Sequence, residues 1–367
     1  MTDTSRSFSP RWASPPGDTI QDALEEQGLS RESFAEAIGI TTSRLPALLN
    51  GREAISVALA RRISSAIGGS VEFWLARDGQ YRDDLAMVEA DRWAQSLPIA
   101  QMAQLGWIEK TDNWRDRTSA CLRFFDIRDL AEWRQSYGNM LVHTRFRVSE
   151  KTTLDRGSAA AWLRKAEIEA TKIDCAQWDP DVFLSALDEL RPLTRVSDPQ
   201  RFIPKLISSC ADAGLALVVL RAPTGCPASG AARYLDTGTP LVVLSARYLA
   251  NDHFWFSFLH EAGHVLMHAA AEAYVDDLDR STERPAGKDE READKFATDW
   301  LVPAPLREEL LSGRPTPTRL HQLANEAGVS SGILVGQLQY DGVLGFGSVL
   351  NRLKHRNKWA GSTLEKA

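Results

Sequence analysis

The stretch HEAGHVLMH, residues 260–268, ends a long apolar segment, and the interpretation of the whole sequence depends on it. On a helix, His260 and His264 project to the same side, so both imidazoles can reach one metal ion. Two imidazoles, a carboxylate and an open position make a catalytic zinc site. Glu261 is rotated by about 100° from His260, where it can accept a proton from water. The alternative is an ordinary helix that carries histidines, but chance rarely produces this spacing with 7 histidines in 367 residues.

A third ligand is expected from DEREADKFATDWLVP, residues 289–303, which has the periodicity of a second helix. Glu290 and Asp294 share a stripe with the apolar residues of this helix, whereas Glu292 shares a face with charged residues. We therefore predict Glu290 as the third zinc ligand and keep Glu292 as the alternative. Asp294, one turn further on, is expected to hold a liganding histidine through its distal N–H.

The segment before this helix predicts a small sheet. LALVVL (215–220), GAARYL (230–235) and PLVVLSA (240–246) are typical of strands, and a long helix with Asp252 as a possible cap follows them. A small sheet that leads into a helix with this histidine spacing is the layout of a zincin. If GAARYL is an edge strand, it could hold an extended peptide.

Three further residues are candidate partners for an oxyanion, with packing as the simpler alternative for each: Tyr234, His268 and Tyr274. His268 lies about 80° round the helix from His260, which makes it a poor metal ligand.

Residues 16–82 have a different pattern, with short helical segments separated by glycines. Two of these segments, joined by a Gly-containing turn, predict a helix-turn-helix, and Ser30 is a good N-cap for the first. A recognition helix contacts bases through its N-terminal residues, so the candidate DNA contacts are Thr41, Thr42, Ser43, Arg44 and Arg52. Two features weaken this prediction. The first 82 residues contain 9 Arg, no Lys and 10 acidic residues, and Pro46 lies inside the expected recognition helix.

Composition limits the remaining possibilities. The net charge is −6, hydrophobic residues make up 43% of the chain, and no apolar run is long enough to span a membrane. The N-terminus lacks the apolar region of a signal peptide, and the four cysteines are scattered, which predicts a cytoplasmic protein with reduced thiols.

The expected fold class is α+β and mostly helical, with the following parts: a flexible N-terminus (1–15), a helix-turn-helix bundle (16–82), a helical connecting region (83–200), a zincin-like domain with a small β-sheet packed on the histidine-bearing helix and a helical extension (201–358), and a polar tail (359–367).

Both recognisable parts resemble known families. PGD, LSRESFAEAIGI, LLNGREAIS, ALARRISSAIG and EFWLARDGQYR follow one another as in the Xre-type helix-turn-helix of HigA-like antitoxins. SGAARYL, PLVVLSA, FWFSFLHEAGHVLMH and EREADKFATDWLVP resemble the ImmA/IrrE metallopeptidases, the last being similar to that family's ExEAxxFAxxLLxP. This resemblance implies a gluzincin-like site with Zn²⁺ and proteolysis of a protein partner, often a repressor.

The leading hypothesis is a cytoplasmic regulator, expected to be a homodimer, that binds a double-stranded DNA operator and cleaves a protein partner. The setting would be a toxin–antitoxin, prophage or stress-response system. One alternative is a non-catalytic HigA-like antitoxin and autorepressor that uses the zincin fold as a sensor or docking module. Another is a peptidase whose helix-turn-helix only recruits a protein such as a toxin.

Overall fold

The computed structural model describes residues 10–143, 145–146, 155–268 and 287–367. Its contacts divide the chain into an N-terminal unit, residues up to 96 with 109–130, and a C-terminal unit, 97–108 with 131–367. The architecture is mostly helical with small sheets, as expected. The boundary expected at residue 82 falls inside one continuous helix, α5 (Val71–Ala94), and the expected connecting region is divided between both units.

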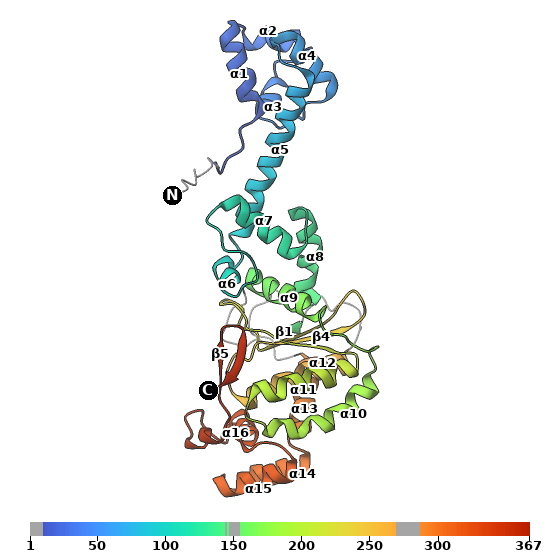
Figure 1. Ribbon diagram of the computed structural model, residues 1–367, viewed down its shortest axis with the longest axis vertical. Coiled ribbons are helices and arrows are strands. Elements are labelled where there is room, and N and C mark those ends of the chain that lie inside the picture. Colours follow the sequence, from blue (N-terminus) through green and yellow to red (C-terminus); the bar gives the residue numbers. More distant parts are fainter. Residues whose placement is uncertain (1–9, 144, 147–154, 269–286) are drawn as a thin grey trace, which may run out of the picture. The chain divides into compact units, whose positions relative to one another are not determined.

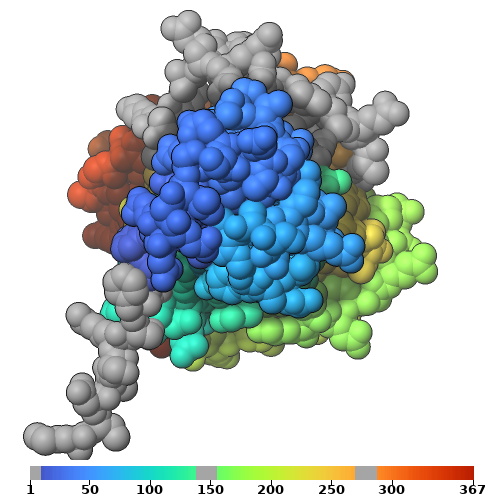
Figure 2. All heavy atoms as spheres, turned by 90° about the horizontal axis from the view of Figure 1, so that it is seen from above, coloured from blue at the N-terminus to red at the C-terminus, as the bar shows by residue number. Residues whose placement is uncertain are grey.

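The N-terminal unit is a helical bundle (Figure 1), and most of its atoms are the blue spheres in Figure 2. Its helices are α1 (Pro16–Gln27), α2 (Arg31–Ala37), α3 (Leu45–Leu49), α4 (Val57–Ile67), α5 and α7 (Trp114–Phe125). The Ser30 side chain accepts a hydrogen bond from the backbone N–H of Ser33, so the predicted cap of α2 is confirmed. Ser56 and Ser70 cap α4 and α5 in the same way. These caps explain why several short helices can begin so close together.

The helix-turn-helix bundle has its own hydrophobic core. The core includes Ile20, Phe34, Ile38, Leu48, Leu59, Ile63 and Trp74, all less than 5% exposed. Gly17 allows α1 to approach α3 closely, because a Cβ atom on it would lie 1.9 Å from the carbonyl oxygen of Leu49. The glycine of PGD therefore sets the packing of α1 against the second helix of the motif.

The C-terminal unit is built on a four-stranded sheet with the order β1-β3-β4-β2. The strands are β1 (Arg145–Phe146), β2 (Ala216–Val219), β3 (Gly230–Tyr234) and β4 (Pro240–Leu244), and the last three agree with the prediction. β2 and β4 are parallel, whereas β3 is antiparallel to both of its neighbours. In Figure 1, α9 (Arg156–Ala170) covers one face of the sheet, and α11 (Pro199–Asp212) and α12 (Asn251–Met267) lie on the other.

Further helices complete this unit. They are α6 (Ile99–Gln104), α8 (Leu130–His143), α10 (Pro180–Leu190), α13 (Lys288–Leu301), α14 (Ala304–Ser312), α15 (Pro317–Ala327) and α16 (Ser331–Tyr340), with 3₁₀ turns at Arg191–Arg195 (η1) and Val349–Leu353 (η2). Among the helices of the described ranges, none combines the length and apolar character that crossing a membrane requires.

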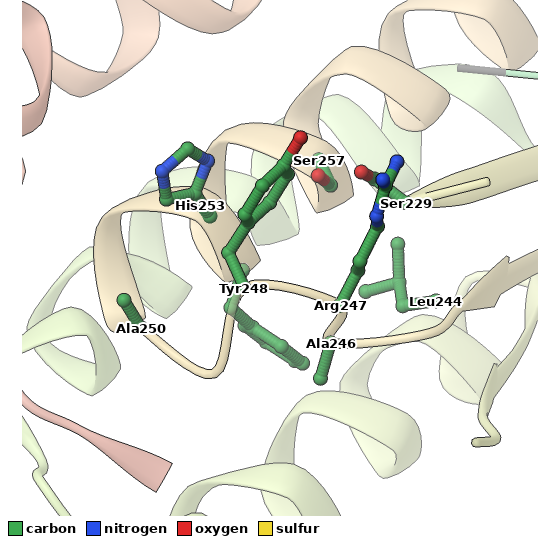
Figure 3. Close-up of a pocket in the computed structure, with 9 residues that line it drawn as sticks. Ser229, Leu244, Ala246, Arg247, Tyr248, Ala250, His253 and Ser257 are labelled. Carbon is green, nitrogen blue, oxygen red and sulfur yellow. The ribbon is translucent and has the colours of Figure 1, made fainter. Parts of the chain in front are cut away.

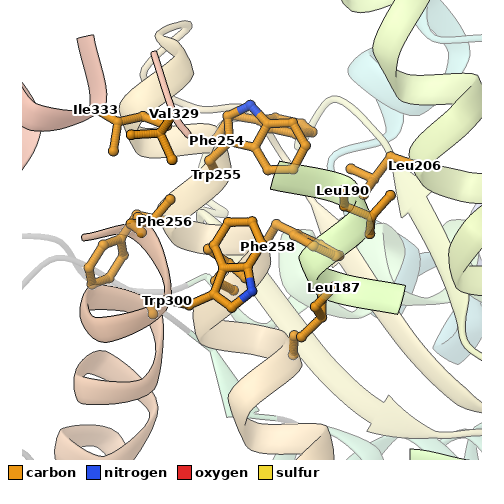
Figure 4. Close-up of a cluster of buried hydrophobic side chains, with 14 of the residues drawn as sticks. Leu187, Leu190, Leu206, Phe254, Trp255, Phe256, Phe258, Trp300, Val329 and Ile333 are labelled. Atoms are coloured by element: carbon orange, nitrogen blue, oxygen red, sulfur yellow. The ribbon is translucent and has the colours of Figure 1, made fainter. Parts of the chain in front are cut away.

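The core of this unit forms around the aromatic residues of α12 (Figure 4). Phe254, Trp255 and Phe258 are each at most 3% exposed, and they pack with leucines of α10 and α11 and with Trp300 of α13. Full burial of one such side chain contributes about 1.5–3 kcal/mol. α12 is therefore the central element of the domain. Burial of its aromatic residues holds the polar residues of the same helix in fixed positions.

The first turn of α12 differs from the prediction. Ala250, not Asp252, occupies the N-cap position, and no side chain caps the helix. Asp252 is instead buried, with its Oδ2 2.5 Å from Nζ of Lys354, and the Lys354 Nζ also donates to Oε1 of Gln339 at 2.6 Å. The two charged side chains are 6% and 4% exposed. This ion pair joins the start of α12 to the C-terminal segment.

The final residues also differ from the prediction. The expected polar tail, 359–367, contributes to a hairpin formed by β5 (Asn357–Ala360) and β6 (Thr363–Lys366). Leu364 is 4% exposed within the core, and Trp359 packs partly buried against the same core. Apolar residues on these two short strands thus supply the burial that holds the segment in place.

We expect Lys354→Met to destabilise the C-terminal unit by about 3–5 kcal/mol, because it leaves the Asp252 carboxylate buried without its charged partner. Lys295→Met is the matched control, since the Lys295–Asp299 pair is exposed and is expected to contribute less than about 1 kcal/mol. Urea denaturation monitored by tryptophan fluorescence measures both. Equal effects of the two substitutions would contradict the assignment of Asp252–Lys354 as a structural pair.

Candidate functional site

α12 and α13 bring three potential metal ligands together. Nε2 of His260 and Nε2 of His264 lie 3.1 Å apart. Oε2 of Glu290 lies 3.3 Å from the first nitrogen, and its Oε1 lies 3.2 Å from the second. Both histidine side chains are 2% exposed, and Glu290 is 36% exposed. The predicted ligand set thus forms one cluster with access to solvent at the carboxylate.

These donors fit zinc. Atoms bonded to a tetrahedral Zn²⁺ at about 2.0–2.1 Å lie roughly 3.3 Å apart, which is close to the observed separations. Two imidazoles and one carboxylate are borderline donors that suit zinc, and three protein ligands leave a fourth position open for catalysis. The residues present therefore match a catalytic zinc site in donor type, number and spacing.

A glycine makes this convergence possible. A Cβ atom on Gly263 would lie 3.3 Å from Cα of Ala293 and 3.2 Å from the ring of Phe296. Ala293 and Ala297 are fully buried on the facing side of α13. Small residues on both helices therefore permit a close approach, which brings Glu290 within reach of the histidines.

The first histidine is held by a direct carboxylate contact. Nδ1 of His260 lies 2.9 Å from Oδ1 of Asp294, so the distal N–H can donate to Asp294 while Nε2 stays available for a metal. This is the arrangement expected from the spacing of Glu290 and Asp294. The hydroxyl of Tyr340, on α16, donates to Oδ2 of Asp294 at 3.4 Å.

The second histidine is held through another histidine. Nδ1 of His264 lies 3.1 Å from Nδ1 of His268, and Nε2 of His268 lies 3.1 Å from Oε2 of Glu292. If His264 uses Nε2 for the metal, its Nδ1–H donates to His268, which in turn donates its Nε2–H to Glu292. Each N–H group in this series of hydrogen bonds then has an acceptor. Glu292, the alternative ligand, lies at the end of this chain, whereas Glu290 lies between the two metal-facing nitrogens.

The pKa values of Glu290 and Glu292 are both lowered, which is consistent with a metal ligand and a hydrogen-bond acceptor. Burial pushes the pKa of Glu290 upward, but hydrogen bonds and charge from His260 and His264 outweigh it and hold the pKa well below its usual range. The hydrogen bond from His268, with a smaller effect of Lys288, lowers the pKa of Glu292. Both carboxylates are therefore ionised at neutral pH, as a ligand and an anchoring acceptor must be.

Glu261 lies beside this cluster rather than in it. It is fully buried, and a Cβ atom on Gly230 at the start of β3 would lie 2.6 Å from its Oε1. The strand therefore needs glycine at this position to leave room for the carboxylate. Sequence reasoning identified Glu261 but missed both Gly230 and the His268–Glu292 pair. A histidine one turn after His264 was the available signal for that pair.

The three candidate oxyanion partners have different positions. Tyr234 donates its hydroxyl to the backbone carbonyl of Val265 at 3.4 Å, which is a packing role. Burial raises its pKa, so the hydroxyl stays protonated. His268 takes part in the chain described above, and Tyr274 lies outside the described residues.

The helix-turn-helix presents its candidate contacts at the surface. Thr41, Thr42, Ser43 and Arg44 are exposed and form the turn before α3, and Arg52 is exposed in the loop after it. Pro46 is in the first turn of α3, where its missing N–H removes no helical hydrogen bond. This short helix therefore accommodates Pro46 at its start.

One of the two candidate arginines is already paired. Nε of Arg44 donates to Oε2 of Glu53 at 2.8 Å, and Nη2 contacts the other carboxylate oxygen. This hydrogen bond, with the charge of Glu53, raises the pKa of Arg44. Among the described residues, no carboxylate forms an ion pair with Arg52. The positive charge available to a phosphate is thus smaller at Arg44 than at Arg52.

Comparisons with known families agree with this division. The helix-turn-helix family model matches residues 20–74, and the model of the IrrE N-terminal-like domain, peptidase family M78, matches residues 214–338. The chain combines an Xre-type helix-turn-helix domain with an IrrE/ImmA-like peptidase domain. The second match contains α12, α13 and the complete ligand cluster.

Two curated relatives each match a short part of the chain. One is the uncharacterized HTH-type transcriptional regulator YddM of Escherichia coli (strain K12), 40% identical over 60 residues, which are 16% of this chain and 64% of the relative. The other is the virulence-associated protein A' of Dichelobacter nodosus, 35% identical over 74 residues, 20% of this chain and 63% of the relative. The chain spans slightly less than two thirds of either relative.

The two glutamates of α13 should differ in their effect on zinc. We expect Glu290→Ala to abolish stoichiometric zinc binding, because it removes a ligand. Glu292→Gln should keep the metal but weaken its affinity by about 10–100-fold, because it acts only through His268. Competition with a chelator, followed by mass spectrometry, measures both. Asp299→Asn, on the exposed face of the same helix, is the control. Zinc loss in Glu292→Gln with retention in Glu290→Ala would exchange the two roles.

Proposed function

We propose that this protein is a cytoplasmic DNA-binding regulator whose IrrE/ImmA-like domain is a zinc-dependent endopeptidase that cleaves a protein partner. The observation that carries the proposal is the cluster of His260, His264 and Glu290 with Glu261 buried beside it. The helix-turn-helix match, and the description of YddM as a transcriptional regulator, support the regulatory half.

The residues of the site suit peptide hydrolysis. A bound Zn²⁺ would supply Lewis acidity, polarising a peptide carbonyl and making a water molecule more acidic. Glu261 would take the proton from that water and deliver it to the leaving amine. Its burial against Gly230 limits the positions that the carboxylate can adopt. Asp294 and the His268–Glu292 pair would keep both imidazoles in the orientation and tautomer that the metal needs.

An extended polypeptide is the substrate class that the sheet favours. β3 lies next to α12, and its outer side pairs, within the described residues, only with the two-residue strand β1. Arg145 pairs with Ala232 and Phe146 with Ala231. The remaining backbone of this edge could bind an extended segment by strand addition, close to Glu261.

The biological setting follows from the combination of domains. A regulator that carries its own peptidase suits a toxin–antitoxin, prophage or stress-response system, in which cleavage of a partner changes transcription. Operator recognition by a helix-turn-helix usually uses two half-sites, so we propose a homodimer. The slightly acidic N-terminal block and the Arg44–Glu53 pair favour a second candidate, in which this domain recruits a protein such as a toxin instead of DNA. A HigA-like antitoxin without catalysis is the non-enzymatic alternative.

Glu261→Gln should retain zinc and DNA binding but reduce peptide cleavage by at least about 100-fold, because the proton acceptor is lost while the ligands remain. Gly230→Ala should also reduce cleavage, because the added methyl group displaces the carboxylate. Cleavage of a peptide mixture, read by mass spectrometry, measures both against zinc content. Full activity of Glu261→Gln would contradict the proposed mechanism. The absence of any cleavage by the zinc-loaded wild type would favour the antitoxin alternative.

The DNA-binding half makes a separate prediction. Arg52→Ala should weaken binding to a fragment of the protein's own promoter and reduce the slope of log K against log salt by about 1. Glu53→Gln should strengthen binding, because it releases Arg44 from its ion pair. Glu26→Gln, an exposed change of equal charge on α1, is the control. Wild-type protein that shows no salt-dependent binding would leave the recruitment alternative.

A further inference from the structure

A second group of polar side chains lines a small hollow near Glu261. Ser229, Arg247, Tyr248, His253 and Ser257 contribute to its lining. Figure 3 shows the side chains of Arg247 and Tyr248 running in the same direction, with the hydroxyl groups of Ser229 and Ser257 between their polar ends. A guanidinium and several hydroxyl groups are the donors that proteins use to bind a carboxylate.

Two of the residues that line the hollow place it close to Glu261. Ser257 precedes Glu261 by four residues on α12, which is about one turn or 6 Å. Ser229 precedes Gly230, whose Cβ position lies 2.6 Å from Oε1 of Glu261. A group bound in the hollow would therefore be about one residue of an extended peptide away from the reacting bond.

Arg247 has binding capacity that the fold does not use. Within the described residues, no carboxylate forms an ion pair with it, and its side chain is half-buried. Its Nη1 donates to the carbonyl of Pro227 at 2.5 Å, which fixes the guanidinium and leaves its other donors for a ligand. By contrast, Arg233 on the same sheet is paired with Glu167.

The backbone on either side of Arg247 and Tyr248 is conformationally strained. Ala246 and Leu249, on either side of the pair, have φ angles of 49° and 52°, a region that residues other than glycine rarely adopt. Tyr248 is 42% exposed, stacks on His253 with 4.3 Å between the ring centroids, and lies beneath the Arg247 guanidinium. Such strain is found where a local geometry is needed for function.

From these contacts we infer that the hollow is a specificity subsite that binds a carboxylate of the substrate polypeptide, either an acidic side chain or a chain terminus. This rests on the proposed peptidase function, because it assigns a substrate class to that site. The residues enclose little space, so the hollow suits a single small group and has no room for a nucleotide. Arg247 supplies the charge, and the hydroxyl group of Ser229 lies on the side nearest Glu261.

The first test measures binding without catalysis. N-acetyl-glutamate methylamide and its neutral counterpart, N-acetyl-glutamine methylamide, are titrated against the zinc-loaded full chain by saturation-transfer NMR. We expect the acid to bind at least about tenfold more tightly than the amide, with this preference lost in Arg247→Gln and partly kept in Arg247→Lys. Arg221→Gln, an exposed arginine outside the hollow, should behave like the wild type. Circular dichroism checks the fold of each variant.

The second test uses cleavage of a peptide mixture by the same proteins. Cleavage by the wild type next to Asp, Glu or a C-terminus, with this preference lost in Arg247→Gln, would support both proposals. A carboxylate preference in binding that depends on Arg247, without cleavage of any peptide, would support the subsite and overturn the peptidase. Equal binding of acid and amide by the wild type, or an unchanged preference in Arg247→Gln, would overturn the subsite even if peptides are cleaved.

Discussion

The close crossing of α12 and α13 is the constraint on which the candidate metal centre depends. Gly263 lets the two helices approach so closely that a Cβ atom on it would lie 3.3 Å from Cα of Ala293. An alanine at position 263 would require its neighbours on α13 to shift by a few tenths of an ångström, and a longer side chain would require more. The aromatic residues of α12, buried in the core, hold the other side of the helix. The buried aromatic residues on one side of α12 and the polar cluster on the other side are therefore both satisfied by the same placement of this helix.

The two histidines are supported in different ways, and this has consequences for the chemistry. Asp294 contacts His260 directly, whereas Glu292 reaches His264 through His268. Both arrangements place a carboxylate behind an imidazole, which fixes the tautomer and increases its strength as a ligand. The His264 support comes from a more exposed carboxylate, because Glu292 is 42% exposed and Asp294 28%. The environment of one ligand is therefore more open to solvent than that of the other.

Charged side chains are arranged differently around α12 and around α3. The peptidase-like domain buries ionised groups and satisfies them in pairs, as at Asp252–Lys354. Around α3 the candidate contact residues lie at the surface, and Glu53 offsets part of the charge of Arg44. Few unpaired positive charges lie at the candidate contacts, so DNA recognition by this domain would depend more on shape and on hydroxyl contacts from Thr41 to Ser43.

The sequence by itself determined the elements and the faces they present. The spacing of His260 and His264 placed both on one side of a helix, and periodicity put Glu290 and Asp294 on the inward stripe of the next. The strands GAARYL and PLVVLSA followed from composition, and Ser30 was evident as a cap. These features are local, because each depends on residues within a few positions of one another.

Only the tertiary structure decided which faces meet. Asp252 looked like a helix cap, but Lys354, 102 residues away, is its partner. Glu292 looked solvent-facing, but it ends the hydrogen-bond chain from His264. The need for glycine at position 230 appears only when β3 is set against Glu261, and the polar tail becomes a hairpin because Leu364 finds a place in the core. Periodicity specifies the direction in which a side chain points, whereas its partner depends on packing between elements distant in sequence.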